Sequence, residues 1–271
     1  MAALETLTVD ITNKVATITL NRPEALNSFN STMRTELVEL WGQLRGNDDV
    51  NVIVVTGAGD RAFCTGIDRT EAMGDIDLES DDLDGYVTPF MFDDPGHAMS
   101  PKSNELWKPI IAAVNGMACG GAFYLLGEAD IIICSETATF FDPHVTYGMT
   151  AAFEPIQLLG RMDFGDLMRM SLLGASERMS AATALHAGLV TEVVAPGELR
   201  ARAIELAETV ASAPPLATQG TIRALWLGRE LSRRQALDTA YLLVAQGTSK
   251  ASLAEGQERF SAGARVEWRL R

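Results

Sequence analysis

The sequence predicts an α/β protein in which buried strands lead into glycine-rich turns and then into helices. Residues 110–114 are five consecutive apolar residues that end at the turn pair Asn115-Gly116, and residues 52–56 form a second apolar run that ends at Gly57. Short apolar runs bounded by turn residues are typical of buried strands. From residue 198 onward the pattern is helical, which adds a helical C-terminal part to the α/β core.

The other elements are predicted from the same periodicities. Alternating apolar and polar residues at 7–11 and 15–20 surround a polar turn and predict a hairpin. Asn30 or Ser31 caps a helix that has one apolar face. Further strands are predicted at 131–134, 139–141 and 189–194, and further helices at 148–160, 164–173, 181–187, 198–212, 215–227, 232–248 and 250–262.

Residues 75–101 are rich in Asp and show no sustained period, so we expect a long acidic loop that can hold a short helix. Its candidates for facing a ligand are His97, Tyr86, Phe90 and Phe92. The alternative is a solvated loop whose aromatic side chains only attach it to the surface.

Composition narrows the class of protein. The chain has 271 residues, 47% of them apolar and 21% charged, which is ordinary for a globular protein with a large core. Its net charge of −14 argues against a nucleic-acid partner. No apolar run is long enough to cross a bilayer and the first residues lack a signal pattern, so no membrane partner is expected. Cys64, Cys119 and Cys134 lack metal-ligand spacing, which predicts a reduced, cytoplasmic protein without a metal site.

A glycine-rich turn is the strongest local signal. Gly120, Gly121 and Ala122 follow one predicted strand and precede a helix, so unpaired backbone N–H groups point toward one place. Glycines allow a ligand to approach the backbone closely. Such a site suits an anion, or an oxygen on which charge develops during a reaction. The alternative is a turn that serves packing alone.

Four motifs in order resemble one family. RAFCTGID (61–68) and AAVNGMACGGAF (112–123) resemble the crotonase (enoyl-CoA hydratase/isomerase) superfamily, and ITLNRPEALNSFN (18–30) and ATFFDPHVTYG (138–148) extend the resemblance over nearly the whole chain. The resemblance implies a crotonase-type spiral of ββα units over residues 1–195 and a C-terminal helical trimerisation region over 196–271. It also implies an acyl-CoA thioester as substrate, no cofactor beyond the coenzyme A of that substrate, and a homotrimer or a hexamer of two trimers.

The resemblance also implies roles for individual residues. The backbone N–H groups of Ile67 and Gly121 correspond to the two donors that stabilise a thioester enolate oxygen. Arg22, Arg61 and Arg69 are candidates for the phosphates of coenzyme A; the alternative is that they form solvated ion pairs. The positions that correspond to substrate or coenzyme A contacts are Arg22, Ala25, Leu26, Cys64, Gly66, Asp68, Gly120 and Phe260.

The acid–base positions depart from the family pattern. Hydratases of the family usually carry Glu at the two places held here by Tyr124 and His144. A histidine exchanges protons near neutral pH, whereas a phenol normally donates a hydrogen bond. We therefore expect His144 to move protons with help from Tyr124. The alternatives are a turn histidine bound to backbone and a tyrosine that only forms the pocket wall.

Two further positions bear on the site. Glu154 is a third acid–base candidate, although an acidic residue in the first turn of a helix also interacts favourably with the helix dipole. Phe260 matches the family's C-terminal signature, but residues 262–264 lack its usual acidic and basic residues and leave only Arg259 and Arg265 nearby.

The predicted activity is that of an enoyl-CoA hydratase or isomerase, most simply a lyase of fatty-acid metabolism. Two alternatives remain open at this point. One is hydrolysis of a thioester or of a β-keto C–C bond by a histidine that activates water, and the other is non-catalytic binding of acyl-CoA.

Overall fold

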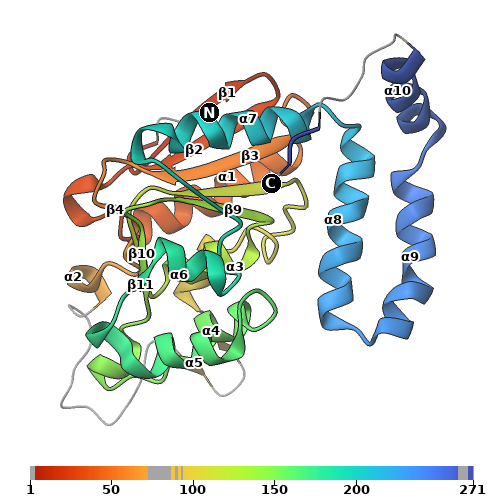
Figure 1. Ribbon diagram of the computed structural model, residues 1–271. Helices are drawn as coiled ribbons and strands as arrows, with labels where there is room; N and C mark the ends of the chain where they lie inside the picture. Colours follow the sequence, from red (N-terminus) through yellow and green to blue (C-terminus); the bar gives the residue numbers. More distant parts are fainter. Residues whose placement is uncertain (1–3, 73–86, 89–90, 93, 262–267, 271) are drawn as a thin grey trace.

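The computed structural model describes residues 4–72, 87–88, 91–92, 94–261 and 268–270 (Figure 1). The strands are β1 (Leu7–Thr12), β2 (Val15–Leu20), β3 (Val52–Gly57), β4 (Ala62–Cys64), β5 (Val87–Thr88), β6 (Met91–Phe92), β7 (Ile110–Val114), β8 (Met117–Cys119), β9 (Ile131–Ser135), β10 (Thr139–Phe141), β11 (Met179–Ser180) and β12 (Glu192–Val194). The α-helices are α1 (Ser31–Arg45), α2 (Arg69–Ala72), α3 (Ala122–Glu128), α4 (Phe153–Leu158), α5 (Phe164–Leu173), α6 (Ala181–His186), α7 (Leu199–Ala211), α8 (Pro215–Glu230), α9 (Arg233–Gly247) and α10 (Lys250–Ser261). Short 3₁₀ helices are η1 (Pro23–Ala25), η2 (Pro95–Met99), η3 (His144–Tyr147), η4 (Gly174–Ser176) and η5 (Pro196–Glu198).

The central strands of the larger sheet are buried on both faces. Within the described residues it has six strands in the order β1-β2-β3-β7-β9-β12, antiparallel only between β1 and β2. Along β3, Ile53 and Val55 pack into one apolar core while Val52 and Val54 pack into a second core on the opposite face. A strand covered on both faces reads as a continuous apolar run, which is why the sequence signal at 52–56 is so clear.

Strands of a second, smaller sheet alternate along the chain with strands of the first. Its four strands, as far as the chain is described, run in the order β11-β10-β8-β4. Three strands of the larger sheet are each followed along the chain by a strand of this sheet: β3 by β4, β7 by β8 and β9 by β10. Helices α2 and α3 close the first two pairs. This repeat is a spiral of ββα units followed by a helical C-terminal region, so the predicted fold class is confirmed.

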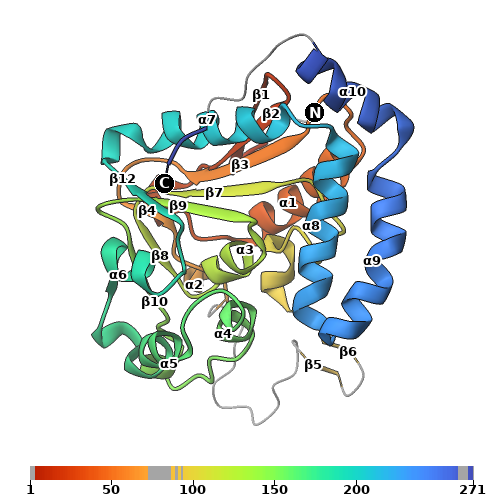
Figure 2. The same ribbon diagram turned by 45° about the vertical axis from the view of Figure 1, so that its right-hand side comes forward.

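Two helices cover the two faces of the larger sheet (Figure 2). Helix α1 buries Trp41 and four other apolar side chains, and its N-terminus is capped by Asn30, which accepts a 3.0 Å hydrogen bond from Met33 N. Helix α7 packs on the other face through Ala203, Ala207 and Ala211, whose small side chains at four-residue spacing let the helix lie close to the strands. The first of the C-terminal helices is thus part of the sheet core, and the domain boundary after residue 195 stays a prediction.

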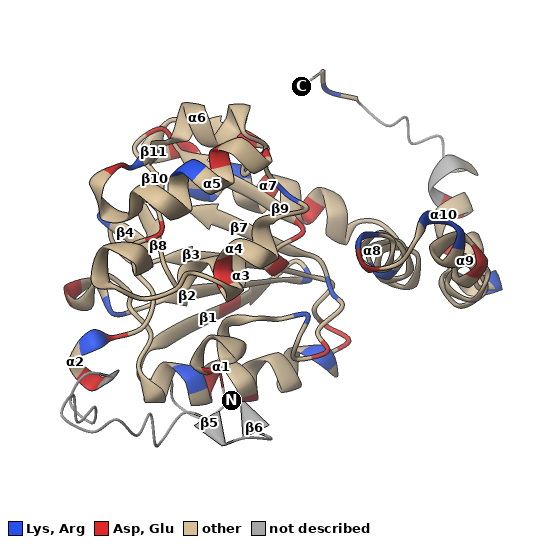
Figure 3. Cartoon of the chain, turned by 90° about the horizontal axis from the view of Figure 1, so that it is seen from below, with Lys and Arg blue, Asp and Glu red and all other residues tan. Residues whose placement is uncertain are grey.

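Helices α8 and α9 stand beside the core as a pair (Figure 3). They approach closely where Gly220 faces Gly247, since a Cβ added at Gly220 would lie 3.3 Å from Gly247 Cα. Trp226 of α8 donates from Nε1 to Asp130 Oδ1 at 2.7 Å and thereby attaches the pair to the core. Two cavities of about 490 Å³ and about 310 Å³ lie along α8.

Three local predictions are wrong in extent or lie outside the described residues. The helix expected at 148–160 covers Phe153–Leu158 only, and the strand expected at 189–194 covers Glu192–Val194, because Val190 N bonds back to Ala184 O in the turn after α6. The acidic loop ends in η2, while Tyr86, Phe90 and the side chain of Phe92 lie outside the described residues. Among the residues that are described, no helix is both long and apolar enough to span a bilayer.

Candidate active site

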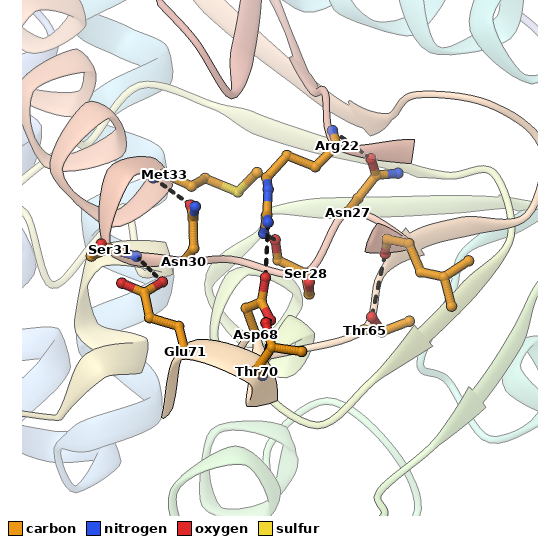
Figure 4. A network of polar contacts seen from close by, with 11 residues as sticks. Arg22, Asn27, Ser28, Asn30, Ser31, Met33, Thr65, Asp68, Thr70 and Glu71 are labelled. Atoms are coloured by element: carbon orange, nitrogen blue, oxygen red, sulfur yellow. Dashed lines mark hydrogen bonds and ion pairs between the residues drawn. The ribbon is translucent and has the colours of Figure 1, made fainter. Parts of the chain in front are cut away.

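The loop between β2 and α1 is held by a buried asparagine. Asn27 donates from Nδ2 to Ala58 O at 3.0 Å and to Ala62 O at 2.8 Å, and its Oδ1 accepts from Arg22 N at 3.0 Å (Figure 4). Leu26 and Asn27 both have positive φ, 53° and 55°. Asn tolerates this conformation better than most residues, so the side chain fixes a strained turn beside the first glycine motif.

Arg22 is engaged within the protein. Its guanidinium donates to Ser28 O at 2.7 Å and forms an ion pair with Asp68 at 2.8 Å (Figure 4). Asp68 also accepts from Thr70 Oγ1 at 2.6 Å, and Thr70 and Arg22 together hold the pKa of Asp68 below its usual value. Asp68 therefore anchors the turn after Gly66, and a contact of Arg22 or Asp68 with coenzyme A stays a prediction.

Two backbone N–H groups lie close together beside the glycine motifs. Phe29 N donates to Gly66 O and Asp68 N donates to Phe29 O, both at 2.9 Å, in an isolated parallel bridge between Phe29 and Ile67. In this pattern the N–H of Ile67 points away from the bridge. Gly66 adopts φ +82°, and a Cβ there would lie 2.8 Å from Gly121 N. The N–H of Gly121 is thus next to the Gly66-Ile67 turn, and neither N–H has an acceptor within the part of the chain that the structure describes.

Glycine is required at both turns for steric reasons. Gly120 has φ +52°, and a Cβ at Gly121 would lie 2.6 Å from Phe29 Cε1, a buried ring. The nearby thiols of Cys64 and Cys119 are buried, and burial raises the pKa of each to about 12. Both cysteines are therefore neutral packing groups near the turns.

His144 lies between two carboxylates. Its Nδ1 is hydrogen-bonded to Asp142 Oδ1, and its Nε2 lies 3.4 Å from Glu154 Oε1. The bond to Asp142 raises the pKa of His144, whereas burial raises the pKa of Glu154. The imidazole also approaches the glycine turn, because a Cβ at Gly120 would lie 3.9 Å from His144 Cε1. The cluster thus holds an exchangeable proton beside the two N–H groups.

Tyr124 is buried one turn further along α3. Its ring packs on Gly96, where an added Cβ would lie 2.3 Å from Tyr124 Cε2. Burial, followed by the nearby carboxylate of Asp94, raises the pKa of Tyr124. The phenol therefore stays protonated.

The structure brings most predicted site residues together. The residues that lie around one place are Ile67, Gly66, Gly120, Gly121, Tyr124, His144 and Glu154. Beside it lie Arg22, Leu26 and Asp68 on loops, Ala25 at the end of η1 and Cys64 at the end of β4. Arg61 is exposed, Arg69 lies 4.1 Å from the ring centre of Tyr147, and His97 is exposed on η2. The side chain of Phe260 lies outside the described residues. Neither of the two cavities along α8 is lined by His144 or Tyr124.

Sequence reasoning missed three residues of this site, Asn27, Asp94 and Asp142. Asn27 and Asp142 stand inside the recognised motifs, so their motif membership was the available signal. Asp94 is one of many acidic residues in a segment without period, and nothing in the sequence distinguishes it. Among the described side chains, no His, Cys, Asp and Glu cluster is arranged to hold a metal ion.

The fold and this arrangement define a spiral α/β protein with paired backbone donors beside a histidine–carboxylate cluster. A model of the enoyl-CoA hydratase/isomerase family matches residues 10–270. The chain therefore belongs to the enoyl-CoA hydratase/isomerase family and is an acyl-CoA-processing enzyme of that type.

Individual relatives agree with this assignment. The chain is 36% identical to (E)-benzylidenesuccinyl-CoA hydratase of Thauera aromatica over 88% of each chain. It is 32% identical to the short-chain-enoyl-CoA hydratase of Clostridium acetobutylicum, over 90% of this chain and 88% of that one. An enoyl-CoA hydratase/isomerase structure from Mycobacterium paratuberculosis superimposes with a TM-score of 0.84 and 34% identity, covering 99% of this chain and 100% of the other.

Proposed function

We propose that the enzyme reversibly adds water across the Cα–Cβ double bond of a 2-enoyl-CoA thioester. The observation that carries this proposal is the position of His144 between Asp142 and Glu154. It lies beside two backbone N–H groups that have no hydrogen-bond acceptor among the described residues. The arrangement offers a base, a proton donor and an oxyanion site in one place, although the two usual Glu positions hold Tyr124 and His144. Relatives whose names are hydratase or dehydratase support the choice of reaction.

The addition of water takes place in two steps, in which electrons and protons balance. The carboxylate of Glu154 takes a proton from water as the water oxygen bonds to Cβ, and the π electrons move to the thioester oxygen. That enolate oxygen accepts hydrogen bonds from the N–H groups of Ile67 and Gly121, worth about 3 kcal/mol per donor in a dry site. The imidazolium of His144 then protonates Cα, which completes the addition of one water.

The contact between His144 and Glu154 allows both groups to return to their starting protonation states. After turnover Glu154 carries the proton and His144 is neutral, and their 3.4 Å separation allows the proton to pass from Oε1 to Nε2. Asp142, bonded to Nδ1, keeps the ring oriented with Nε2 toward Glu154. Tyr124, a buried and neutral phenol, lies beside the pair, and a direct hydrogen bond from Tyr124 to substrate stays a prediction.

The test is incubation of the protein with 2-enoyl-, 3-enoyl- and 3-keto-CoA esters, followed by chromatography and mass spectrometry. We expect the 2-enoyl ester to gain one water and the matched His144→Ala variant to lose this activity. A shift of the double bond without a mass change would replace the proposal by isomerisation. Release of free coenzyme A or of a shortened acyl chain would replace it by hydrolysis, and unchanged but bound esters would show a binding protein.

We also propose that the chain assembles as a homotrimer, single or paired into a hexamer. Two apolar surfaces support this: Phe164 and Leu172 of α5 are 63% and 64% exposed, and Tyr241 and Val244 of α9 are 81% and 61% exposed. Apolar side chains gathered on one helix face are typical of surfaces that are buried in an oligomer.

Native mass spectrometry checks the assembly. The unchanged chain is expected at three or six times its 29.2 kDa mass. A Leu172→Asp, Tyr241→Asp variant should dissociate, because it places charges in the proposed interfaces. Val38→Asp, at a 47% exposed position of α1, is the control that should leave the assembly unchanged. A monomeric unchanged chain would contradict the proposal.

A further inference from the structure

The smaller of the two cavities along α8, about 310 Å³ in volume, lies between α8 and the core. The charged side chains that line it are Asp130, Arg161 and Arg229, and Ile222 and Trp226 are among its apolar ones. None of its lining residues belongs to the oxyanion turns or to the His144 cluster. Two arginines thus share a cavity outside the candidate active site, in a chain whose net charge is −14.

The carboxylate of this cavity is already engaged by other groups. Asp130 Oδ2 forms an ion pair with Lys102 Nζ at 2.8 Å and accepts a hydrogen bond from Ile110 N at 2.7 Å. Its Oδ1 accepts from Trp226 Nε1 at 2.7 Å. Because the ammonium group of Lys102 balances the charge of Asp130, this carboxylate does not neutralise the two arginines.

Arg161 has hydrogen bonds but no opposite charge. Its Nη2 donates to the backbone oxygens of Gly127 and Ala129, and its Nε is buried without an acceptor in the described part of the chain. Among the ion pairs of the described residues, none includes Arg161 or Arg229. Burial, followed by the charge of Arg229, lowers the pKa of Arg161 to about 10. The cavity therefore contains a guanidinium group that lacks a counter-ion.

Arg229 brings a second guanidinium group to the same wall. It lies over the ring of Trp226, 4.7 Å from the ring centre, and against Gly160, where an added Cβ would lie 2.6 Å from Arg229 Nη2. Gly160 directly precedes Arg161, so the absence of a side chain at position 160 lets Arg229 reach the backbone beside Arg161. Two like charges at one cavity repel each other unless an anion lies between them.

We propose that this cavity binds a phosphate group between Arg161 and Arg229, as the free ion or as the phosphate of a small organic molecule. Guanidinium groups offer planar pairs of N–H donors that match phosphate oxygens, and a phosphate dianion balances two positive charges. The bound phosphate joins α8 to the segment that follows α4. The inference is independent of the proposed hydration, because the cavity shares no residue with the candidate active site.

The test is isothermal titration calorimetry of the full chain with inorganic phosphate, with sodium chloride at equal ionic strength as the reference. We expect saturable binding of one phosphate per chain and no saturable binding of chloride. Thermal unfolding should shift to higher temperature with phosphate concentration, because the ion binds the folded chain. A titration with phenyl phosphate separates the two sources. Tighter binding of the ester assigns the site to an organic phosphate whose apolar part contacts Ile222, and equal binding assigns it to the free ion.

Two variants place the binding at this cavity. Arg229→Gln removes one exposed guanidinium group and should weaken phosphate binding by about tenfold or more, because a hydrogen bond to a charged group is lost. Gly160→Ala keeps both charges but displaces the Arg229 guanidinium, so it should weaken binding in the same direction. The matched control is Arg200→Gln at an exposed position of α7, which removes an equal charge away from the cavity and should leave the dissociation constant unchanged.

The outcomes decide the proposal in either direction. Saturable binding that Arg229→Gln and Gly160→Ala weaken and Arg200→Gln does not would establish the site. Absence of saturable binding would overturn it, as would be the case if a carboxylate of a second copy filled the cavity. Equal weakening by all three variants, or by neither cavity variant, would also contradict it, because the phosphate would then respond to the overall field or to another site. Circular dichroism checks that each variant is folded.

Discussion

Replacing Glu154 by Gln is expected to lower kcat for hydration by about a hundredfold to ten-thousandfold. The amide has nearly the same shape and is still able to contact His144 Nε2, 3.4 Å from Glu154 Oε1 in the unchanged protein, but it cannot take a proton from water. Because Glu154 is buried, an isosteric substitution preserves the packing of α4. Stopped-flow loss of enoyl-thioester absorbance measures kcat, and circular dichroism confirms that the variant is folded.

The pH dependence of the same rate provides a second readout. Burial raises the pKa of Glu154 above its ordinary 4.5, and the bond to Asp142 raises the pKa of His144 above its ordinary 6.5. As pH rises, Glu154 first loses its proton and becomes the base, and His144 later loses the proton that it must donate. The profile should therefore be bell-shaped, with both limbs at higher pH than the ordinary pKa values of Glu and His would give. Because the two groups interact, the apparent pKa of each limb belongs to the pair and not to one residue.

Two controls make this prediction decisive. Glu154→Gln should abolish the acid limb, and Glu177→Gln, on an exposed ion pair with Arg169, should leave the whole profile unchanged.

Glu154 and His144 both hold protons more tightly in the folded chain than in the unfolded one. Their contribution to stability is therefore present at low pH and is lost as pH rises through their folded pKa values. A wild-type kcat in Glu154→Gln would remove this residue from the mechanism.

Substituting Gly121 by Ala is expected to abolish most activity and to lower stability together. The new Cβ would lie 2.6 Å from Cε1 and 2.8 Å from Cζ of Phe29, and 3.3 Å from Gly66 Cα. Phe29 is 2% exposed and cannot swing away, so the Gly121 backbone must move relative to Ile67. Loss of one aligned donor costs about a hundredfold to a thousandfold in kcat, and overpacking costs about 1–3 kcal/mol of folding free energy.

Gly42→Ala is the matched control for that substitution. Gly42 lies inside α1, and nothing lies within 4 Å of its added Cβ. Alanine should therefore stabilise the helix by about 1 kcal/mol and leave kcat unchanged. Urea unfolding measures the two free energies, and the hydration assay measures the two rates. If Gly121→Ala keeps the wild-type kcat, the N–H of Gly121 is not an oxyanion donor.

The strands and the glycine turns were predictable because their signals are local. The apolar runs of β3 and β7 indicate strands that are buried on both faces. Gly120 and Gly121 indicate a turn that needs a flexible backbone. Each of these signals is contained within a few residues. The helix cap at Asn30 is local in the same sense. These features determined the fold class and the oxyanion candidates.

The assignment of helices to layers was not predictable. The sequence shows four C-terminal helices with similar amphipathic patterns, yet α7 covers the sheet while α8 and α9 stand beside it. What selects α7 is the fit of Ala203, Ala207 and Ala211 against the strands, a property of two surfaces that a single helical pattern does not contain. The extent of β12 likewise depends on a bond between Val190 and Ala184.

The sequence by itself determined the family and the glycine turns, and it showed Tyr124 and His144 at the two positions where the resemblance implies Glu. Only the tertiary structure decided which groups lie against these two side chains, because those groups come from other elements: Glu154 of α4 beside His144, and Gly96 of η2 beside the ring of Tyr124. Burial and hydrogen bonding set the proton affinities of these groups, and both depend on neighbours that are distant along the chain. A motif specifies which residues are present, whereas their chemistry follows from the groups that the fold places against them.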